Sequence, residues 1–140
     1  MSESTSCIFC KIVRGEIPAV KVHEDEHTLT FMDIQPASPG HTLVISKAHA
    51  PNLLEIAEPD LLAVTVTVQR IARAVQKALM PDGLRIGQFN GAAAGQTVLH
   101  YHVHIVPMHE GQRAGAHGRA AARPEDLRAL AAQIQAALGE

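Results

Sequence analysis

The sequence reads Val98-Leu99-His100-Tyr101-His102-Val103-His104-Ile105-Val106 in the last third of the chain, and this stretch decides the expected fold. Histidines alternate with bulky residues along it, which predicts a β-strand over 98–106 that Pro107 ends. Residues two apart in a strand share a face and lie about 6–7 Å from each other, so the three imidazoles are expected side by side. Ionisable groups on a half-buried face are costly unless each has a partner. The strand is therefore expected to carry the functional site.

Two chemical roles fit three neighbouring histidines. In one, His100, His102 and His104 together bind a catalytic zinc that keeps an open coordination position. In the other, the roles are divided, and a neutral imidazole whose proton is fixed on one nitrogen attacks phosphorus with the other. The preceding loop favours the second role, because Asn90-Gly91-Ala92-Ala93-Ala94-Gly95-Gln96-Thr97 is bounded by glycines and is suited to bring backbone N–H groups close to phosphate oxygens.

Four further strands are expected around this one. Segments 20–23 and 28–32 have the β-branched and alternating residues of a hairpin. A third strand at 41–46 follows the proline- and glycine-rich loop 35–40, and a fourth is expected at 84–90. Connections as short as a hairpin turn favour antiparallel pairing.

Three helices complete the expected elements. A short turn spans 8–13, and a long central helix starts at Pro59 and stops at 80–83. Apolar residues recur every three or four positions along the central helix, at Leu61, Val64, Val68, Ile71, Val75 and Ala78. A last helix starts at Pro124 and ends at Gly139. Together the elements predict an α+β domain built on a five-stranded antiparallel sheet, with a long central helix and a C-terminal helix.

Composition limits the classes of protein to which the chain can belong. Its 140 residues are 46% hydrophobic and 19% charged, which is typical of one soluble globular domain spanning 1–140. The net charge of -2 and the absence of a long basic tract argue against a nucleic-acid polymer as partner. No apolar run approaches the roughly 20 residues that span a bilayer, and the N-terminus lacks the pattern of a signal peptide. We expect a cytoplasmic protein with no membrane partner.

The two cysteines, Cys7 and Cys10, form one Cys-x-x-Cys pair. In a reducing compartment this spacing indicates metal binding or redox chemistry more than a structural disulfide. The spacing alone does not decide between these uses or exclude two ordinary reduced thiols.

The stretch 95–106, in which Gly-Gln-Thr-Val precedes the His-x-His-x-His core, resembles the signature of the histidine-triad (HIT) nucleotide-binding proteins. Four upstream stretches stand in the order and spacing of that family: Cys7–Ile12, Gly15–Pro18, Phe31–Ile34 and Pro39–Ile45. The resemblance covers about residues 7–109 and leaves the helical tail 110–140 outside. It implies a HIT-like fold, and within the family the chain is most similar to the HINT-like branch with an N-terminal Cys-x-x-Cys zinc site.

The resemblance implies a purine nucleotide site in which His102 attacks the α-phosphate and is transiently adenylylated before water releases AMP. His104 and His41 would contact the phosphate as further catalytic residues. The rest of the site implied by the resemblance consists of Asn90, Gln96 and Thr97 around the phosphate, Asp33 at the ribose, and Ile8, Phe9, Ile17, Phe31 and Ile34 around the base. A carboxylate suits a vicinal diol and apolar walls suit a purine face, although core packing explains the apolar residues equally well and Asp33 could instead form a turn.

The same resemblance assigns Cys7, Cys10, His49 and His100 to a zinc site. Four protein ligands leave no position for water or substrate, so the implied role of the zinc is structural. The chemical step on His102 would then require no metal.

The substrate implied is an adenosine 5′-phosphoramidate, in which an amine is attached to AMP. Thr97 and Pro107 resemble instead the branch of the family that splits dinucleoside polyphosphates, which is the alternative substrate class. A nucleotide-binding regulatory module with little turnover is a third interpretation. The resemblance also implies a homodimer, for which the sequence itself offers only an apolar helix face.

Overall fold

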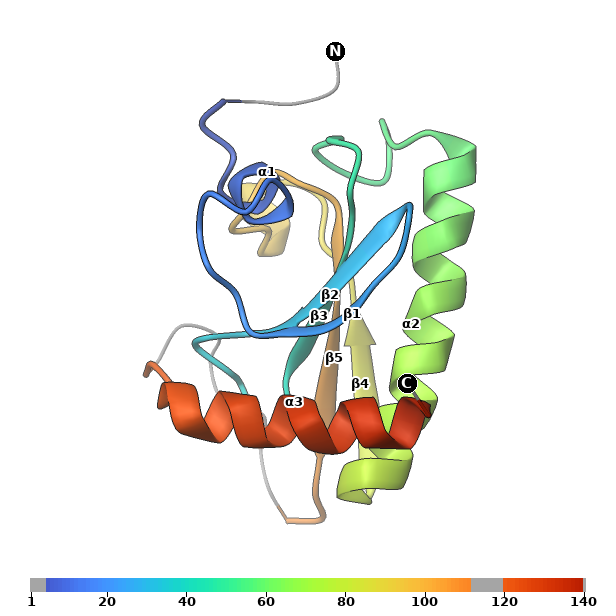
Figure 1. Ribbon diagram of the computed structural model, residues 1–140. Helices are drawn as coiled ribbons and strands as arrows, with labels where there is room; N and C mark the ends of the chain where they lie inside the picture. The colour runs from blue at the N-terminus through green and yellow to red at the C-terminus, as the bar shows by residue number, and fades with distance from the viewer. Residues whose placement is uncertain (1–4, 112–119, 140) are drawn as a thin grey trace.

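The computed structural model describes residues 5–111 and 120–139. Its elements lie in the order α1 (Ile8–Val13), β1 (Lys21–Glu24), β2 (Thr28–Met32), β3 (Thr42–Ser46), α2 (Glu58–Leu79), β4 (Gly83–Gly87), the 3₁₀ turn η1 (Ala92–Ala94), β5 (His102–Met108) and α3 (Pro124–Leu138). The strands form one antiparallel sheet in the order β1-β2-β3-β5-β4 (Figure 1). The predicted α+β architecture is therefore confirmed. No helix among the described residues is long and apolar enough to cross a membrane.

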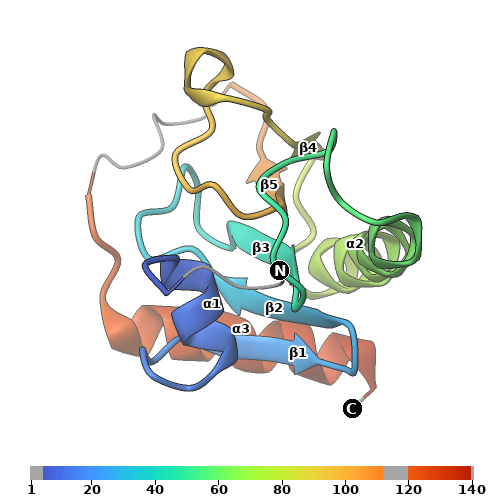
Figure 2. The same ribbon diagram turned by 90° about the horizontal axis from the view of Figure 1, so that it is seen from above.

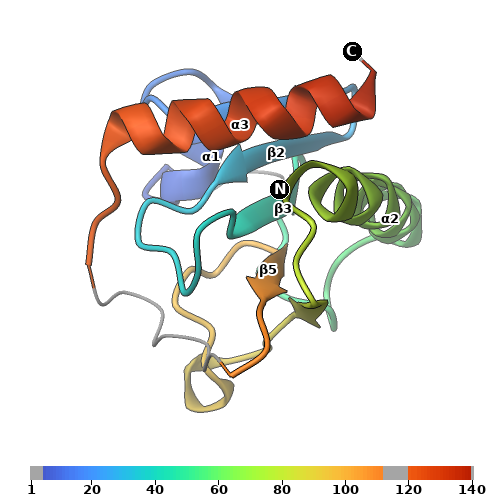
Figure 3. The ribbon, with the colours of Figure 1, turned by 90° about the horizontal axis from the view of Figure 1, so that it is seen from below.

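One face of the sheet is covered by the two long helices. Helix α3 runs across the strands and α2 runs along them, and the two pack against each other (Figures 1 and 3). Val44 and Ile105 of the sheet, Ile71 of α2 and Ile134 of α3 are all fully buried in this core. The predicted end of the central helix is confirmed, because α2 stops at Leu79 and Met80 closes it in the left-handed conformation at φ 48°.

The opposite face carries the short helix α1 and a smaller core (Figure 2). Phe9 and Ile12 of α1 pack on Phe31, Leu43 and other apolar side chains of β2 and β3. This core occupies only part of that face, and the histidines of β5 lie beside it. The histidines of β5 therefore lie on the face of the sheet that the long helices leave uncovered.

A row of paired residues crosses this face in register. Phe31 of β2 pairs with Leu43 of β3, Leu43 pairs with His104 of β5, and His104 pairs with Gly87 of β4. Paired residues in an antiparallel sheet direct their side chains to the same face. The row therefore fixes the order of these side chains across the site.

Strands β5 and β4 have boundaries that differ by two residues or more from those that the sequence predicts. Strand β5 begins at His102 instead of Val98, because residues 98–101 leave the sheet in a turn in which the His100 N–H donates to the Val98 carbonyl at 2.9 Å. The strand also continues through Pro107, which is tolerated because its pairing with β3 ends at Ile105 and Pro107 lies beyond that ladder. Strand β4 ends at Gly87 instead of Asn90.

The turn between β1 and β2 joins the two segments that were expected to form a hairpin, and it depends on Asp25. Its carboxylate accepts hydrogen bonds from the His27 N–H at 2.9 Å and from the N–H and hydroxyl of Thr28 at 2.8 and 2.9 Å. Partial burial would raise the pKa of Asp25, but these hydrogen bonds outweigh it and the pKa is lowered. The charged carboxylate of Asp25 thus accepts the hydrogen bonds that hold the turn of the hairpin.

Candidate active site

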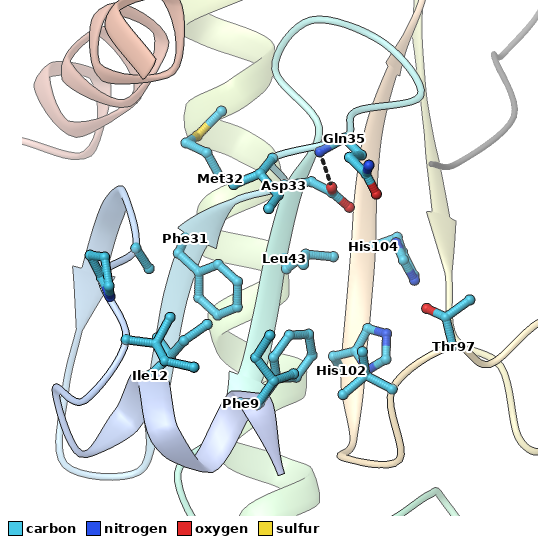
Figure 4. A pocket seen from close by; sticks show the side chains of 16 residues that line it. Phe9, Ile12, Phe31, Met32, Asp33, Gln35, Leu43, Thr97, His102 and His104 are labelled. Atoms are coloured by element: carbon cyan, nitrogen blue, oxygen red, sulfur yellow. Dashed lines mark hydrogen bonds between the residues drawn. The ribbon is translucent and has the colours of Figure 1, made fainter. Parts of the chain in front are cut away.

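A cavity of about 270 Å³ opens on the histidine face of the sheet, between α1, β2 and β5 (Figure 4). Its walls are mostly apolar, and polar side chains gather at one end, where Asp33, Thr97, His102 and His104 lie. The apolar lining includes all five residues assigned to the base pocket from the resemblance: Ile8, Phe9, Ile17, Phe31 and Ile34. An apolar cavity with a few convergent polar groups is the usual form of a small-molecule site.

The protonation of His102 is set by a main-chain acceptor. Its Nδ1 lies 2.6 Å from the carbonyl oxygen of His100. A carbonyl oxygen can only accept, so Nδ1 carries the proton and the lone pair of a neutral ring is on Nε2. The ring is 5% exposed, and the edge of Phe9 packs against it at a centroid distance of 5.1 Å. His102 is thus held in the tautomer that a nucleophilic imidazole needs.

His104 and His41 form a second ordered pair. The Ala37 N–H donates to Nδ1 of His41 at 3.0 Å, so the proton of a neutral His41 is on Nε2. That Nε2 lies 2.9 Å from Nδ1 of His104, which is therefore the acceptor. A neutral His104 then carries its own proton on Nε2 and can donate it to a phosphate oxygen. The His104 ring lies beside His102 at a centroid distance of 4.9 Å.

Asp33 and Thr97 lie at the same end of the cavity. Asp33 is buried at the end of β2; its Oδ1 accepts the Gln35 N–H at 2.8 Å, and its Oδ2 lies 3.5 Å from Nε2 of His41 (Figure 4). The carboxylate thus forms a turn, as one interpretation of this residue predicts, and it also lines the cavity. The exposed side chain of Thr97 directs its hydroxyl towards the two imidazoles (Figure 4).

Gln96 and Asn90 lie outside the cavity lining and brace the loop beside it. The buried Gln96 accepts from the Gly91 N–H at 2.7 Å and donates to the Pro51 and Val98 carbonyls at 2.6 and 3.0 Å. Asn90 accepts from the Leu53 N–H and from Gln88, each at 2.8 Å. Both amides hold the shape of the segment that presents Thr97, and neither is brought to the histidines.

His100 lies apart from the other two histidines of the stretch, so the expectation of three imidazoles on one strand is wrong. It precedes β5, and its Nε2 donates to the Ser46 carbonyl at 2.6 Å, which leaves the lone pair on Nδ1. Burial lowers the pKa of His100 to about 4, so the ring is neutral at pH 7. The three rings do not converge on one point as the ligands of a shared catalytic zinc would.

Nδ1 of His100 joins a cluster with Cys7, Cys10 and His49. It lies 3.3 Å from Cys7 Sγ, 3.6 Å from Cys10 Sγ and 3.3 Å from His49 Nδ1, and Cys10 Sγ lies 3.3 Å from His49 Nδ1. On a tetrahedral zinc two imidazole nitrogens lie about 3.3 Å apart, and a nitrogen and a sulfur about 3.5 Å apart. The four donor atoms therefore have the chemistry and the spacing of a closed zinc site.

The Cys/His cluster, formed by Cys7, Cys10, His49 and His100, and the cavity share helix α1. Cys7 caps this helix, with its Sγ accepting the Cys10 N–H at 3.3 Å, and Phe9 between the two cysteines lines the cavity and contacts His102. His100 also joins them, since its ring faces the cysteines while its carbonyl holds the His102 proton. A shift of the cluster residues would therefore also move α1 and the segment of His100, and with them the groups that contact His102.

The sequence did not indicate every residue around the site. Ile12 and Leu43 also line the cavity, which the helical spacing from Ile8 and the strand pairing with Phe31 could have suggested. Phe89 packs against His104 at a centroid distance of 5.4 Å. Since Phe89 lies beyond the end of β4, no periodic pattern could place it.

Residues 14–111 match the HIT domain. The chain belongs to the HIT family. HIT proteins of this kind are nucleotide-binding hydrolases and transferases, and the polar end of the cavity is consistent with that class. The fold is accordingly the HIT-like fold that the sequence resemblance implied.

Similar proteins include two of solved structure. A Hit-like protein of Bartonella henselae, described as involved in cell-cycle regulation, is 44% identical with a TM-score of 0.92, and the match covers 98% of this HIT chain and 99% of that one. A zinc-bound histidine triad family protein of Mycobacterium smegmatis is 38% identical with a TM-score of 0.86, covering 98% and 96%. The adenylylsulfatase HINT3 of Arabidopsis thaliana is 43% identical over 104 residues, which are 74% of this chain and 53% of HINT3.

Proposed function

We propose that this HIT protein cleaves adenosine 5′-phosphoramidates through a covalent adenylyl intermediate on His102. The observation that carries the proposal is the 2.6 Å hydrogen bond from His102 Nδ1 to the His100 carbonyl, because it leaves Nε2 as the attacking lone pair at the polar end of an apolar cavity. Phe9 and Phe31 contact each other edge to face, with their ring centroids 5.4 Å apart, and both line the cavity. A purine packed against this pair would place the α-phosphate of AMP near His102 and His104.

The reaction proceeds in two displacements at phosphorus. In the first, Nε2 of His102 forms the N–P bond, the P–N bond to the amine breaks with its electron pair, and the amine takes a proton from solvent. In the second, water attacks phosphorus, the electron pair of the N–P bond returns to Nε2, and a water proton goes to solvent. The Nε2–H of His104 donates to the phosphate oxygen in both steps, and the His100 carbonyl stabilises the cation formed on His102.

The charge of the cavity supports a phosphoramidate over a dinucleoside polyphosphate. No Lys or Arg is present among the described residues that line the cavity. A polyphosphate chain carries several negative charges, and sites for such chains use cationic side chains or metal ions to neutralise them. A single α-phosphate needs fewer charged partners and is served by the neutral donors present.

A structural zinc held by Cys7, Cys10, His49 and His100 is part of the proposal. The spacing of the four donor atoms and the zinc-bound relative from Mycobacterium smegmatis support it. When bound, zinc would cross-link α1 to the segment before β5 and to His49. No reacting atom would be bonded to the zinc.

A two-fold dimer also belongs to the proposal. Strand β4 is an edge of the sheet, and Ile86 on it is 48% exposed. Helix α2 leaves Leu62 and Val66 exposed one turn apart. An open edge strand beside an exposed apolar helix face supports pairing with a second copy of the chain.

The test is intact-protein mass spectrometry after rapid quenching, with an adenosine 5′-phosphoramidate as substrate and His102→Ala beside the wild type. We expect an added adenylyl mass on the wild-type protein and none on the variant, together with loss of AMP release. Circular dichroism checks that the variant is folded. Turnover that survives in pure His102→Ala protein contradicts the nucleophile assignment, and AMP binding without turnover of any adenylylated compound would favour the regulatory module.

A further inference from the structure

Phe89 lies on the far side of the catalytic histidines from the nucleotide cavity. It is not part of the cavity lining, and its ring packs against His104 with the centroids 5.4 Å apart and the planes tilted by 47°. The residue is 41% exposed although its ring contacts a buried histidine. One side of the phenyl ring thus contacts His104, and another part of the ring surface is exposed and can contact a ligand.

Gly87 makes room for the Phe89 ring at this position. A Cβ added at Gly87 would lie 3.1 Å from Cζ of Phe89, closer than an ordinary van der Waals contact. Because Gly87 pairs with His104, a side chain at Gly87 would point to the face of the sheet that carries the site. The phenyl ring therefore occupies, on that face, the place of the side chain that Gly87 lacks.

The register of the sheet gives the order in which a substrate meets these groups. From β2 to β4 the row is Phe31, Leu43, His104 and then Gly87 under the ring of Phe89. The first two line the apolar cavity, and His104 lies at its polar end. A nucleotide whose base lies over β2 and β3 has its α-phosphate over β5, so the group on the other side of phosphorus extends over the end of β4.

We propose that Phe89 is the apolar wall of the leaving-group site, and that it selects adenylyl substrates whose amine carries an aromatic or alkyl group next to the scissile bond. This inference rests on the proposed function, since it concerns the group that departs from AMP. A phenyl surface binds aromatic and alkyl groups through offset or edge contacts and offers no hydrogen-bond donor to an anionic group.

The experiment compares two adenosine 5′-phosphoramidates that differ only in the amine. One is made with phenethylamine, which reaches the position of Phe89, and the other with methylamine, which does not. The measured quantity is the ratio of kcat/KM for the two substrates. We expect the wild-type protein to favour the phenethylamine compound by roughly threefold to tenfold, the range of one aromatic contact.

Variants of Phe89 and of a cavity residue identify the source of this preference. Phe89→Asn should bring the ratio to about one, and Phe89→Leu, which keeps an apolar side chain, should retain a ratio well above one. Ile34→Ala is the matched control: Ile34 is an exposed apolar residue on the nucleotide side, so its loss should change both substrates alike and leave the ratio unaltered. Slow variants are followed by the rate of adduct formation in a single turnover, which gives the same ratio.

The outcomes separate this inference from the proposed function. A wild-type ratio of one or less, or an unchanged ratio in folded Phe89→Asn protein, overturns the role of Phe89 while turnover and the His102 adduct still stand. Failure to form an adduct or release AMP from either compound overturns the proposed function itself.

Discussion

At the scale of single residues, the site depends on which ring nitrogen of each histidine carries the proton. His41 lies 63 residues before His104 in the sequence, and only the pairing of β3 with β5 brings the two together. His41 is 2% exposed and sits between the Ala37 N–H and His104, so it orients His104 without itself facing the centre of the cavity. Its position could be anticipated only from the family resemblance, because no local pattern links residues so far apart.

Loss of His41 should slow the chemical step. In His41→Ala the acceptor of the Ala37 N–H and the donor to His104 Nδ1 both disappear, so His104 is free to change its tautomer. We expect a fall in kcat of roughly 5-fold to 100-fold, the cost of leaving buried hydrogen-bonding groups unpaired. His41→Gln, whose amide can donate to His104, should recover part of the rate of adduct formation. Equal rates in wild type and His41→Ala would contradict the orienting role.

At the scale of elements, α1 is the part of the fold least able to form on its own. It has six residues, and isolated helices of that length are not stable in water. Two contacts compensate: Phe9 and Ile12 pack on β2 and β3, and the cysteines of α1 meet His49 and His100. A wall of the cavity therefore depends on the Cys/His cluster.

Removal of zinc should weaken nucleotide binding through α1. In Cys10→Ser, or after treatment with a chelator, we expect the free energy of unfolding to fall by about 3 kcal/mol or more, as for other structural metal sites. Because Phe9 then loses its fixed position, KM should rise by roughly threefold to tenfold. The measurements are thermal melts and steady-state kinetics.

The control is the chelator added to Cys10→Ser, which should have no further effect if the cluster is the site of metal loss. A metal-free protein that keeps its stability but makes no adduct at saturating substrate would point to a catalytic metal instead.

The elements also show what the sequence could predict. The helices and the antiparallel sheet were predictable, because each has its own period of apolar residues. The start of β5 was not, since the alternation of His100 with His102 continues through a turn that brings His100 to cysteines far away in the sequence. The end of β4 was missed for a related reason: the ring of Phe89 folds over Gly87, and nothing local signals that contact.

At the scale of the whole molecule, the two faces of the sheet carry different parts of the structure. The face under α2 and α3 holds the main apolar core, and the other face holds the cavity and the Cys/His cluster. Most of the site was predictable at this scale only through the resemblance, because the residues come from α1, β2, β3 and β5. The edge strand β4 is the place at which the proposed dimer would form.

A charge on the outer side of α2 should prevent the proposed dimer. Val66 is 60% exposed, and in a dimer Val66→Lys would bury an unpaired charge. We expect the dissociation constant to rise by roughly 100-fold or more, measured by sedimentation equilibrium. Ala132→Lys, at an exposed position of α3, is the matched control and should stay dimeric. A wild-type protein that sediments as a monomer would exclude the dimer.

The hydrogen bonds that fix the imidazole protons determine which amino-acid substitutions the site tolerates. Ser46 and His100 contribute carbonyl oxygens and Ala37 contributes an N–H, so these partners are present whatever side chain each position carries. Substitutions of Ser46 and Ala37, other than to proline at 37, leave these acceptors and this donor in place. The tautomers of His41, His100 and His102 are thus inherited with the path of the backbone and should persist through sequence divergence for as long as that path is kept, whereas the tautomer of His104 also requires the His41 side chain.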